Sequence, residues 1–174
     1  MKLYEPFDLL TEDQCKEIIK WCVTNGDLQQ GTTYGHRKGK VLNTKVRNNR
    51  VVWYKESKYW QTWIDILNSV SDRKIDWIQT PQISFYKPGE FYEWHEDGFV
   101  NPRTHVRHLT MSCELQTAPG GFLELKDKDI RLKQGQAVVF PVLHRHRAVS
   151  PSEQERISMV IWGMTLNPRF IDKK

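Results

Sequence analysis

The apolar pattern of the chain changes at about residue 74, from a helical period before this point to a period of two after it. The second half contains short alternating runs that are separated by turn residues such as Pro88-Gly89. The expected strands cover residues 77–86, 107–115, 121–125, 136–140 and 156–162. Many short strands of this kind are typical of a mainly β fold, and we expect a double-stranded β-helix, or jelly roll, over about residues 74–165.

The first 73 residues are expected to form a helical support for this core. Thr11 and Gln14 have the spacing of a capping box at the start of a helix, and Gly26 is a stop signal at its end. A second apolar stripe predicts a helix over about residues 57–70, in which Trp60 and Trp63 are interpreted as core residues.

The size and composition of the chain are those of one compact domain, expected to cover residues 1–174. The chain has 174 residues, of which 39% are hydrophobic. Its apolar runs are too short to span a bilayer and it shows no signal-peptide pattern, so we expect a cytoplasmic protein. Cys15, Cys22 and Cys113 have no spacing typical of a metal site, and we interpret them as buried thiols.

Part of the formal net charge of +5 is concentrated in a basic segment, residues 36–50. This segment has three interpretations: a solvated loop, a nucleic-acid contact, or a border of the active site that selects an anionic substrate. Gly31, Gly35 and Gly39 favour a lid that closes over a peptide, with Arg47 and Arg50 as its contacts. The basic residues of the segment are Arg37, Lys38, Lys40, Lys45, Arg47 and Arg50.

Four residues form a spaced constellation that indicates iron chemistry: His95, Asp97, His146 and Arg156. Two imidazoles and one carboxylate can hold Fe(II) on one face, which leaves three coordination positions open for a co-substrate and oxygen. An arginine near such a metal can bind the distal carboxylate of 2-oxoglutarate in a bidentate fork. The parity of the expected strand leaves the third ligand open, because His144 would point to the same side as His146.

Strand alternation separates a polar face from an apolar face in two of the expected strands. Arg156, Ser158 and Trp162 would share one face of the last strand, with its aliphatic residues on the other. In the strand before Pro88, Ser84 and Tyr86 would lie on a polar interior surface. The Tyr86 hydroxyl is therefore a candidate donor to the co-substrate.

Several motifs resemble those of the prolyl 4-hydroxylase branch of the 2-oxoglutarate- and Fe(II)-dependent oxygenases, over about residues 76–164. In that family, the second histidine ligand is followed by a short hydrophobic and proline segment and then by Arg-x-Ser. His146 through Pro151 and then Arg156-Ile157-Ser158 match this order, which favours His146 over His144. The other motifs that carry the resemblance are Tyr86-Lys87-Pro88-Gly89, Tyr92-Glu93-Trp94-His95-Glu96-Asp97, Gly120-Gly121-Phe122-Leu123-Glu124-Leu125 and Phe140-Pro141.

The resemblance implies an enzyme that uses Fe(II), 2-oxoglutarate and O2, with ascorbate as a candidate reductant. It implies that His95, Asp97 and His146 bind the metal. The implied co-substrate residues are Arg156, Ser158, Tyr86, Thr110 and Trp162. The residues expected to contact the substrate are Tyr92, Arg107, Glu114, Arg47 and Arg50.

The expected reaction is hydroxylation of an amino-acid side chain, with a prolyl residue of a peptide or protein as the first candidate. The alternatives are a lysyl or free amino-acid hydroxylase, a nucleic-acid modifying oxygenase, and a non-catalytic cupin-like module that binds metal. Arg156 argues against the last alternative, because a module that only binds metal does not need a guanidinium beside it. No membrane partner is expected, and the sequence does not fix an oligomeric state.

Overall fold

The computed structural model describes residues 1–35, 39–98 and 105–167. Arg37 and Lys38, which belong to the basic segment, lie outside these ranges. Across the described residues, the chain is mainly β, with two α-helices and an antiparallel arrangement of strands.

Both expected helices are present. Helix α1 (Glu12–Asn25) starts at the predicted capping box, in which the Thr11 hydroxyl accepts from the Gln14 N–H and the Gln14 side chain accepts from the Thr11 N–H. It ends at Gly26, whose N–H donates to the Cys22 carbonyl. Helix α2 (Trp60–Asn68) buries Trp63 and Leu67. The predicted core role of Trp63 is therefore confirmed, and Trp60 packs against the same core.

The largest sheet has eight strands, among them the first strand (β1) and the last strand (β14) of the described residues. Its order is β1, β12, β9, β14, β7, β5 and β2, with β6 paired to β14 beside this path. The bounds are β1 Phe7–Asp8, β2 Gln29–Gln30, β5 Arg50–Trp53, β6 Trp77–Ile78, β7 Gln82–Tyr86, β9 His105–Gln116, β12 Gln136–Pro141 and β14 Arg156–Leu166.

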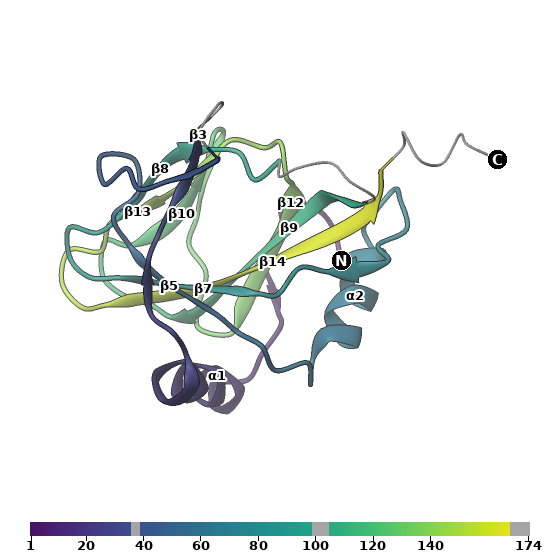
Figure 1. Ribbon diagram of the computed structural model, residues 1–174. Helices are drawn as coiled ribbons and strands as arrows, with labels where there is room; N and C mark the ends of the chain where they lie inside the picture. Colours follow the sequence, from purple (N-terminus) through teal and green to yellow (C-terminus); the bar gives the residue numbers. More distant parts are fainter. Residues whose placement is uncertain (36–38, 99–104, 168–174) are drawn as a thin grey trace.

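A four-stranded sheet and a short hairpin complete the fold. The four-stranded sheet has the order β11 (Lys128–Ile130), β10 (Phe122–Leu125), β13 (His146–Val149) and β8 (Tyr92–His95). The hairpin consists of β3 (Thr33–Gly35) and β4 (Gly39–Val41). Figure 1 shows β8, β10 and β13 over one face of the large sheet and both helices at its other side. This is the expected jelly roll, with a cavity between its two sheets.

Alternation along the central strands divides the core from the cavity. Met111, Cys113 and Leu115 of β9 belong to the main core cluster, which also contains Cys15 and Ile18 of α1. Their neighbours Thr110 and Ser112 line the cavity. Ile157, Met159 and Ile161 of β14 belong to the same core, and Ser158 and Trp162 line the cavity. The predicted separation of a polar from an apolar face in β14 is thus confirmed.

The N-terminal part is more than the expected helical support, because three of its strands extend the large sheet. β1 pairs with β12 at one edge. β5 pairs with β7 and β2 pairs with β5. The expected strand over residues 77–86 is divided into β6 and β7, and Pro81 lies between them. Proline has no N–H to donate to a sheet, which explains the break. In the described residues, no helix is long and apolar enough to cross a membrane. The three cysteines are free and buried, as predicted.

Candidate active site

His95 and His146 lie opposite each other in the four-stranded sheet. His95 is the last residue of β8, His146 is the first residue of β13, and the two are register partners. Asp97 follows β8 by two residues, and its N–H donates to the Val142 carbonyl at 2.8 Å. The Thr110 hydroxyl of β9 donates to Asp97 Oδ2, also at 2.8 Å. The large sheet therefore fixes the carboxylate against two imidazoles of the small sheet.

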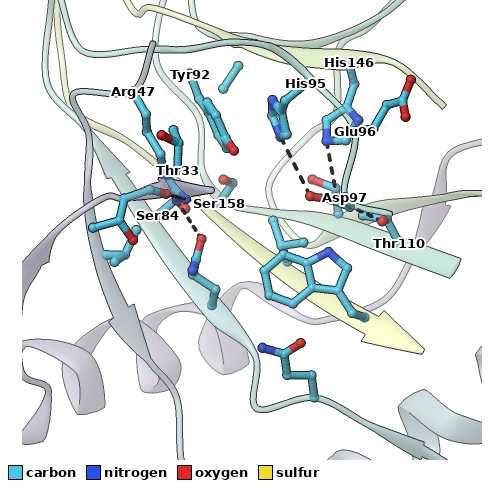
Figure 2. A pocket seen from close by; sticks show the side chains of 18 of the residues that line it. Thr33, Arg47, Ser84, Tyr92, His95, Glu96, Asp97, Thr110, His146 and Ser158 are labelled. Carbon is cyan, nitrogen blue, oxygen red and sulfur yellow. Dashed lines mark hydrogen bonds and ion pairs between the residues drawn. The ribbon is translucent and has the colours of Figure 1, made fainter. Parts of the chain in front are cut away.

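The three side chains converge on one point, as Figure 2 shows. His95 Nε2 lies 3.8 Å from Asp97 Oδ1, and His146 Nε2 lies 3.4 Å from Asp97 Oδ2. One ligand atom from each residue lies within 4.8 Å of the other two. Within the described residues, this is the group of histidine, cysteine and acidic residues that could hold a metal ion. The metal set expected from the sequence is thus assembled in space.

Backbone carbonyls determine which ring nitrogen of each histidine faces this point. His95 Nδ1 lies 2.7 Å from the Glu93 carbonyl, and His146 Nδ1 lies 2.8 Å from the His144 carbonyl. A carbonyl only accepts, so each Nδ1 carries the proton and donates it. In a neutral ring, Nε2 then carries a free lone pair, and in both histidines Nε2 is the nitrogen that faces Asp97. Two imidazole nitrogens and one carboxylate on one side are a donor set that fits Fe(II).

The electrostatics of the metal-free site reflect its burial and its mixed charges. Burial disfavours the charged Asp97 carboxylate, but the attraction of His146 and His95 outweighs it and holds the pKa of Asp97 well below its usual range. Burial and repulsion from His146 lower the pKa of His95 to about 3. Burial would also lower the pKa of His146, but Asp97 reverses this effect and raises it. Asp97 therefore favours a proton on His146 more than on His95.

His144 is not part of this group. Its Nδ1 lies 3.5 Å from the Tyr4 hydroxyl, and its Nε2 lies 3.9 Å from Asp127 Oδ2. These partners belong to a separate depression between the N-terminus and β11. The structure thus places His146, and not His144, beside His95 and Asp97.

A cavity of about 810 Å³ opens above the triad, between the two sheets. It is lined by side chains of β5, β7, β9 and β14 on one wall and of β8, β10 and β13 on the other. Most residues that we expected at the co-substrate or substrate line it. These are Tyr86, Thr110, Arg156, Ser158 and Trp162 for the co-substrate, and Arg47, Tyr92 and Arg107 for the substrate.

Arg156 is fully buried and is bound to Glu114. Arg156 Nη2 donates to Glu114 Oε2 at 2.7 Å, and Arg156 Nε donates to Glu114 Oε1 at 2.9 Å. Burial would lower the pKa of Arg156, but Glu114 raises it and keeps the guanidinium charged. Gly121 passes so close that a Cβ there would lie 2.9 Å from Arg156 Cδ. The glycine of the Gly120-Gly121 motif therefore makes room for the Arg156 stem.

Glu114 does not line the cavity, unlike most of the expected site residues. We expected it at the substrate, but it is buried against Arg156 and is not among the residues that line the cavity. It stands next to Ser158 in the β9–β14 register and points to the same face. In this structure its partner is Arg156, an expected co-substrate residue.

Arg107 and Trp162 form part of the wall nearest to Asp97. The Arg107 guanidinium carbon lies 3.7 Å from the centre of the Trp162 ring, and Arg107 Nη1 donates to the Asp97 carbonyl at 3.2 Å. Trp162 is the register partner of Thr110, whose hydroxyl binds Asp97. The Trp162 indole N–H is buried and has no hydrogen-bond partner. It is available to a ligand in the cavity.

The two arginines expected at the lid have different positions. Arg47 lines the cavity, but its Nε, Nη1 and Nη2 donate to the Asn49 side chain, the Thr32 carbonyl and the Gln82 side chain. Arg50 does not line the cavity; its Nη2 forms ion pairs with Glu90 and Glu155. Arg50 was expected at the substrate, and in this structure its guanidinium lies outside the cavity between two carboxylates.

Sequence reasoning missed the amide side chains and two tryptophans of the wall. Gln82 accepts from Arg47 and Gln79 accepts from Arg107, and each amide holds a guanidinium in place. Gln82 has the same strand parity as Ser84 and Tyr86, and this signal could have identified it. Trp53 and Trp77 also line the cavity, but nothing in their local sequence distinguishes them from core tryptophans.

The comparisons with known proteins agree with this geometry. Residues 81–164 match the family model described as the 2OG-Fe(II) oxygenase superfamily. The match spans β7 to β14, and so includes His95, Asp97, His146 and Arg156. A search of curated proteins found no match.

Several solved structures are similar in fold. A viral collagen prolyl hydroxylase from Paramecium Bursaria Chlorella virus-1, in complex with 2OG, has a TM-score of 0.69 at 23% identity, and the alignment covers 92% of this chain and 95% of that one. A Pseudomonas putida prolyl-4-hydroxylase has a TM-score of 0.66 at 18% identity, with 92% of each chain covered. A prolyl hydroxylase from Trichoplax adhaerens, in complex with a hypoxia inducible factor peptide fragment, has a TM-score of 0.55 at 17% identity, with 87% of this chain and 89% of that chain covered.

Proposed function

The chain belongs to the 2OG-Fe(II) oxygenase superfamily through residues 81–164, and we propose that it hydroxylates a prolyl residue of a peptide or protein. The enzyme is a 2-oxoglutarate-dependent dioxygenase with a His-Asp-His metal site.

The observation that carries the proposal is that one cavity contains both the triad and Arg156. A metal held by His95, Asp97 and His146 is accessible from the cavity. Arg156 lines the same cavity, and its Nη1 is buried without a hydrogen-bond partner. A buried donor without a partner is costly, so such a group is a candidate ligand site. We assign Arg156 Nη1 to the distal carboxylate of 2-oxoglutarate.

The protein side chains would bind and orient the reactants. Bound Fe(II) and 2-oxoglutarate supply the chemistry that uses O2 to hydroxylate a C–H group, with release of succinate and CO2. Thr110 holds the Asp97 carboxylate, and the two backbone carbonyls hold the histidine rings, so the ligand atoms are preorganised. Arg156, with Tyr86 and Ser158 beside it, would orient the co-substrate. No side-chain nucleophile is needed, and positioning is the main contribution of the protein.

The walls of the cavity suit a proline in a peptide. Trp53, whose ring centroid lies 6.2 Å from that of Trp162, offers an aromatic face against which a pyrrolidine ring can pack. The rim carries neutral amides, which can exchange hydrogen bonds with a peptide backbone. The three solved structures described above are named as prolyl hydroxylases, and one of them is in complex with a peptide fragment. These rim amides are Gln29, Gln30, Asn43 and Gln79.

Mass spectrometry of a substrate panel tests the proposal. The protein is incubated with Fe(II), 2-oxoglutarate and air, together with peptides that each contain one proline in different flanking sequences. Each peptide has a matched control in which the proline is replaced by alanine. We expect one added oxygen on a prolyl peptide, none on its alanine control, and succinate formation that depends on the peptide.

The same panel distinguishes the alternative substrates. It also contains lysyl peptides, free amino acids and single-stranded oligonucleotides. An added oxygen on one of these, with none on any prolyl peptide, would contradict the prolyl assignment but leave the oxygenase chemistry intact. The described arginines of the basic segment already have partners within the protein, which does not favour the nucleic-acid alternative.

A further inference from the structure

One edge of the Arg156 guanidinium binds Glu114, and the nitrogen on the other side, Nη1, has no partner. Glu114 occupies the edge formed by Nε and Nη2, with three contacts between 2.7 and 3.2 Å. Nη1 is buried and has no partner. A guanidinium has five N–H donors in a rigid fork, so a carboxylate on the first edge leaves both Nη1 donors and one Nη2 donor for a second carboxylate.

The surroundings of Arg156 fix its stem but not the rotation of its guanidinium. Gly121 lies close to the stem, and the Tyr86 ring centre is 5.5 Å from the guanidinium carbon. Glu114 is the acidic group bound to Arg156 in the described structure, and it holds the head group by two parallel hydrogen bonds. This geometry determines which edge of the guanidinium remains open.

We propose that Glu114 is a positioning and specificity residue that shares Arg156 with the co-substrate. It turns the Nη1 side of the guanidinium toward the cavity and neutralises its charge before 2-oxoglutarate arrives. This inference rests on the proposed role of Arg156 as the partner of the distal carboxylate. Glu114 would lower the affinity for 2-oxoglutarate, because two carboxylates must then share one buried cation.

Charge sharing has a consequence that a purely structural role does not have. If Glu114 already neutralises Arg156, the charge of the distal carboxylate adds little to binding. A neutral distal group should then bind nearly as well as the acid. When Glu114 is neutral, the Arg156 charge lacks a counterion, and the distal carboxylate of the ligand becomes that counterion. The preference for the acid over a neutral analogue should then increase.

Calorimetry with two ligands measures this coupling. The probes are 2-oxoglutarate and its 5-methyl ester, which keeps an acceptor carbonyl but loses the distal charge. Both are titrated into the full chain loaded with Mn(II) in place of Fe(II), without oxygen, for the wild type, Glu114→Gln and Arg156→Met. For Glu114→Gln, we expect tighter binding of 2-oxoglutarate and an acid-to-ester preference at least about fivefold larger than in the wild type.

The three proteins separate the failure of this inference from the failure of the proposed function. If Arg156→Met leaves the affinity for 2-oxoglutarate unchanged, Arg156 does not bind the distal carboxylate and the proposed role itself fails. If Arg156→Met weakens binding but the acid-to-ester preference is the same in the wild type and in Glu114→Gln, Glu114 only supports the fold and the inference is overturned.

The wild type alone provides a second measurement if Glu114→Gln does not fold. With Glu114 in place, we expect the wild type to prefer the acid over the ester by less than about tenfold, because one charge-assisted contact to an uncompensated guanidinium would contribute more than this. A larger preference in the wild type would overturn the inference.

Discussion

The rings of Tyr92 and His95 lie face to face, with centroids 3.5 Å apart and an interplanar angle of 11°. The Arg47 guanidinium carbon lies 4.4 Å from the centre of the Tyr92 ring. Figure 2 shows the three side chains in a row that ends at the triad. Since Arg47 is itself held by Asn49 and Gln82, the stack supports the plane of a metal-ligand imidazole from the wall of the cavity.

This stack predicts that Tyr92 affects metal binding without being a ligand. Tyr92→Leu removes the aromatic face beside His95 and should weaken Mn(II) binding by about tenfold, at the lower end of the effects known for residues that orient metal ligands. Tyr92→Phe keeps the face and is the matched control. Calorimetry with Mn(II) measures both. Equal affinity of the leucine and phenylalanine variants would show that the stack does not orient His95.

The identity of the third metal ligand gives a second prediction. His146→Ala should abolish specific Mn(II) binding, because its Nε2 lies at the triad. His144→Ala should retain it, because His144 faces Tyr4 and Asp127. Electron paramagnetic resonance of added Mn(II) distinguishes free from bound metal. Binding in the His146 variant together with its loss in the His144 variant would reverse the assignment.

The fork geometry of Arg156 gives a third prediction. Arg156→Lys keeps the positive charge but cannot present two parallel donors on one side and a free donor on the other. We expect the affinity for 2-oxoglutarate to decrease by roughly 1.5–3 kcal/mol, the range for one lost charge-assisted hydrogen bond. Calorimetry of the Mn(II)-loaded protein measures the change, and Mn(II) affinity in the absence of 2-oxoglutarate serves as the control. Unchanged affinity for 2-oxoglutarate would refute the role of the guanidinium.

Histidine burial predicts the acid sensitivity of the metal-free protein. Burial and His146 lower the pKa of His95 from 6.5 to about 3. Below pH 6.5, His95 is therefore protonated in the unfolded state but stays neutral in the folded state until about pH 3. The free energy of unfolding decreases as the pH falls from 6.5 toward 3. Between pH 6.5 and about 4.5, the free energy of unfolding should decrease by ~2–3 kcal/mol from this group. Urea unfolding in the presence of a chelator measures it.

The neighbours of His95 do not produce this change in the same window. The contribution of His146, whose pKa is raised, is fully present below its unfolded value of 6.5 and is lost only as the pH rises. The contribution of Asp97, whose pKa is lowered, is present above its unfolded value of 3.8 and is lost only below it. His95→Gln should therefore have a flatter stability profile between about pH 4.5 and 6.5. Parallel profiles of the variant and the wild type would contradict this account.

The strand alternation was sufficient to predict the jelly roll and the polar face that carries Arg156 and Ser158, because burial on one face enforces a period of two. Parity could not separate His144 from His146. The structure separates them because His146 begins β13 opposite His95, whereas the His144 N–H donates to the Pro141 carbonyl in the turn that precedes β13. This difference depends on where the strand starts, which a local pattern does not determine.

Ion pairs between residues far apart in the chain could not be predicted from the sequence either. Glu114 and Arg156 are separated by 42 residues and meet because β9 and β14 pair side by side. Arg50 and Glu155 are separated by 105 residues and meet because β5 and β14 both pair with β7. The sequence alone therefore suggests a substrate contact for a charged residue close to the metal motif, although in the structure its partner lies within the protein. β1 and β2 were missed because strands of two residues leave no period to detect.

The fate of molecular oxygen tests the central claim most directly. The wild type is incubated with Fe(II), 2-oxoglutarate, its substrate from the peptide panel and an atmosphere of oxygen-18, and both products are measured by mass spectrometry. We predict one labelled oxygen on the prolyl residue for each succinate formed, and neither product with His146→Ala. Product oxygen that derives from water, hydroxylation without succinate, or equal turnover by His146→Ala would contradict a 2-oxoglutarate oxygenase that works through His95, Asp97 and His146.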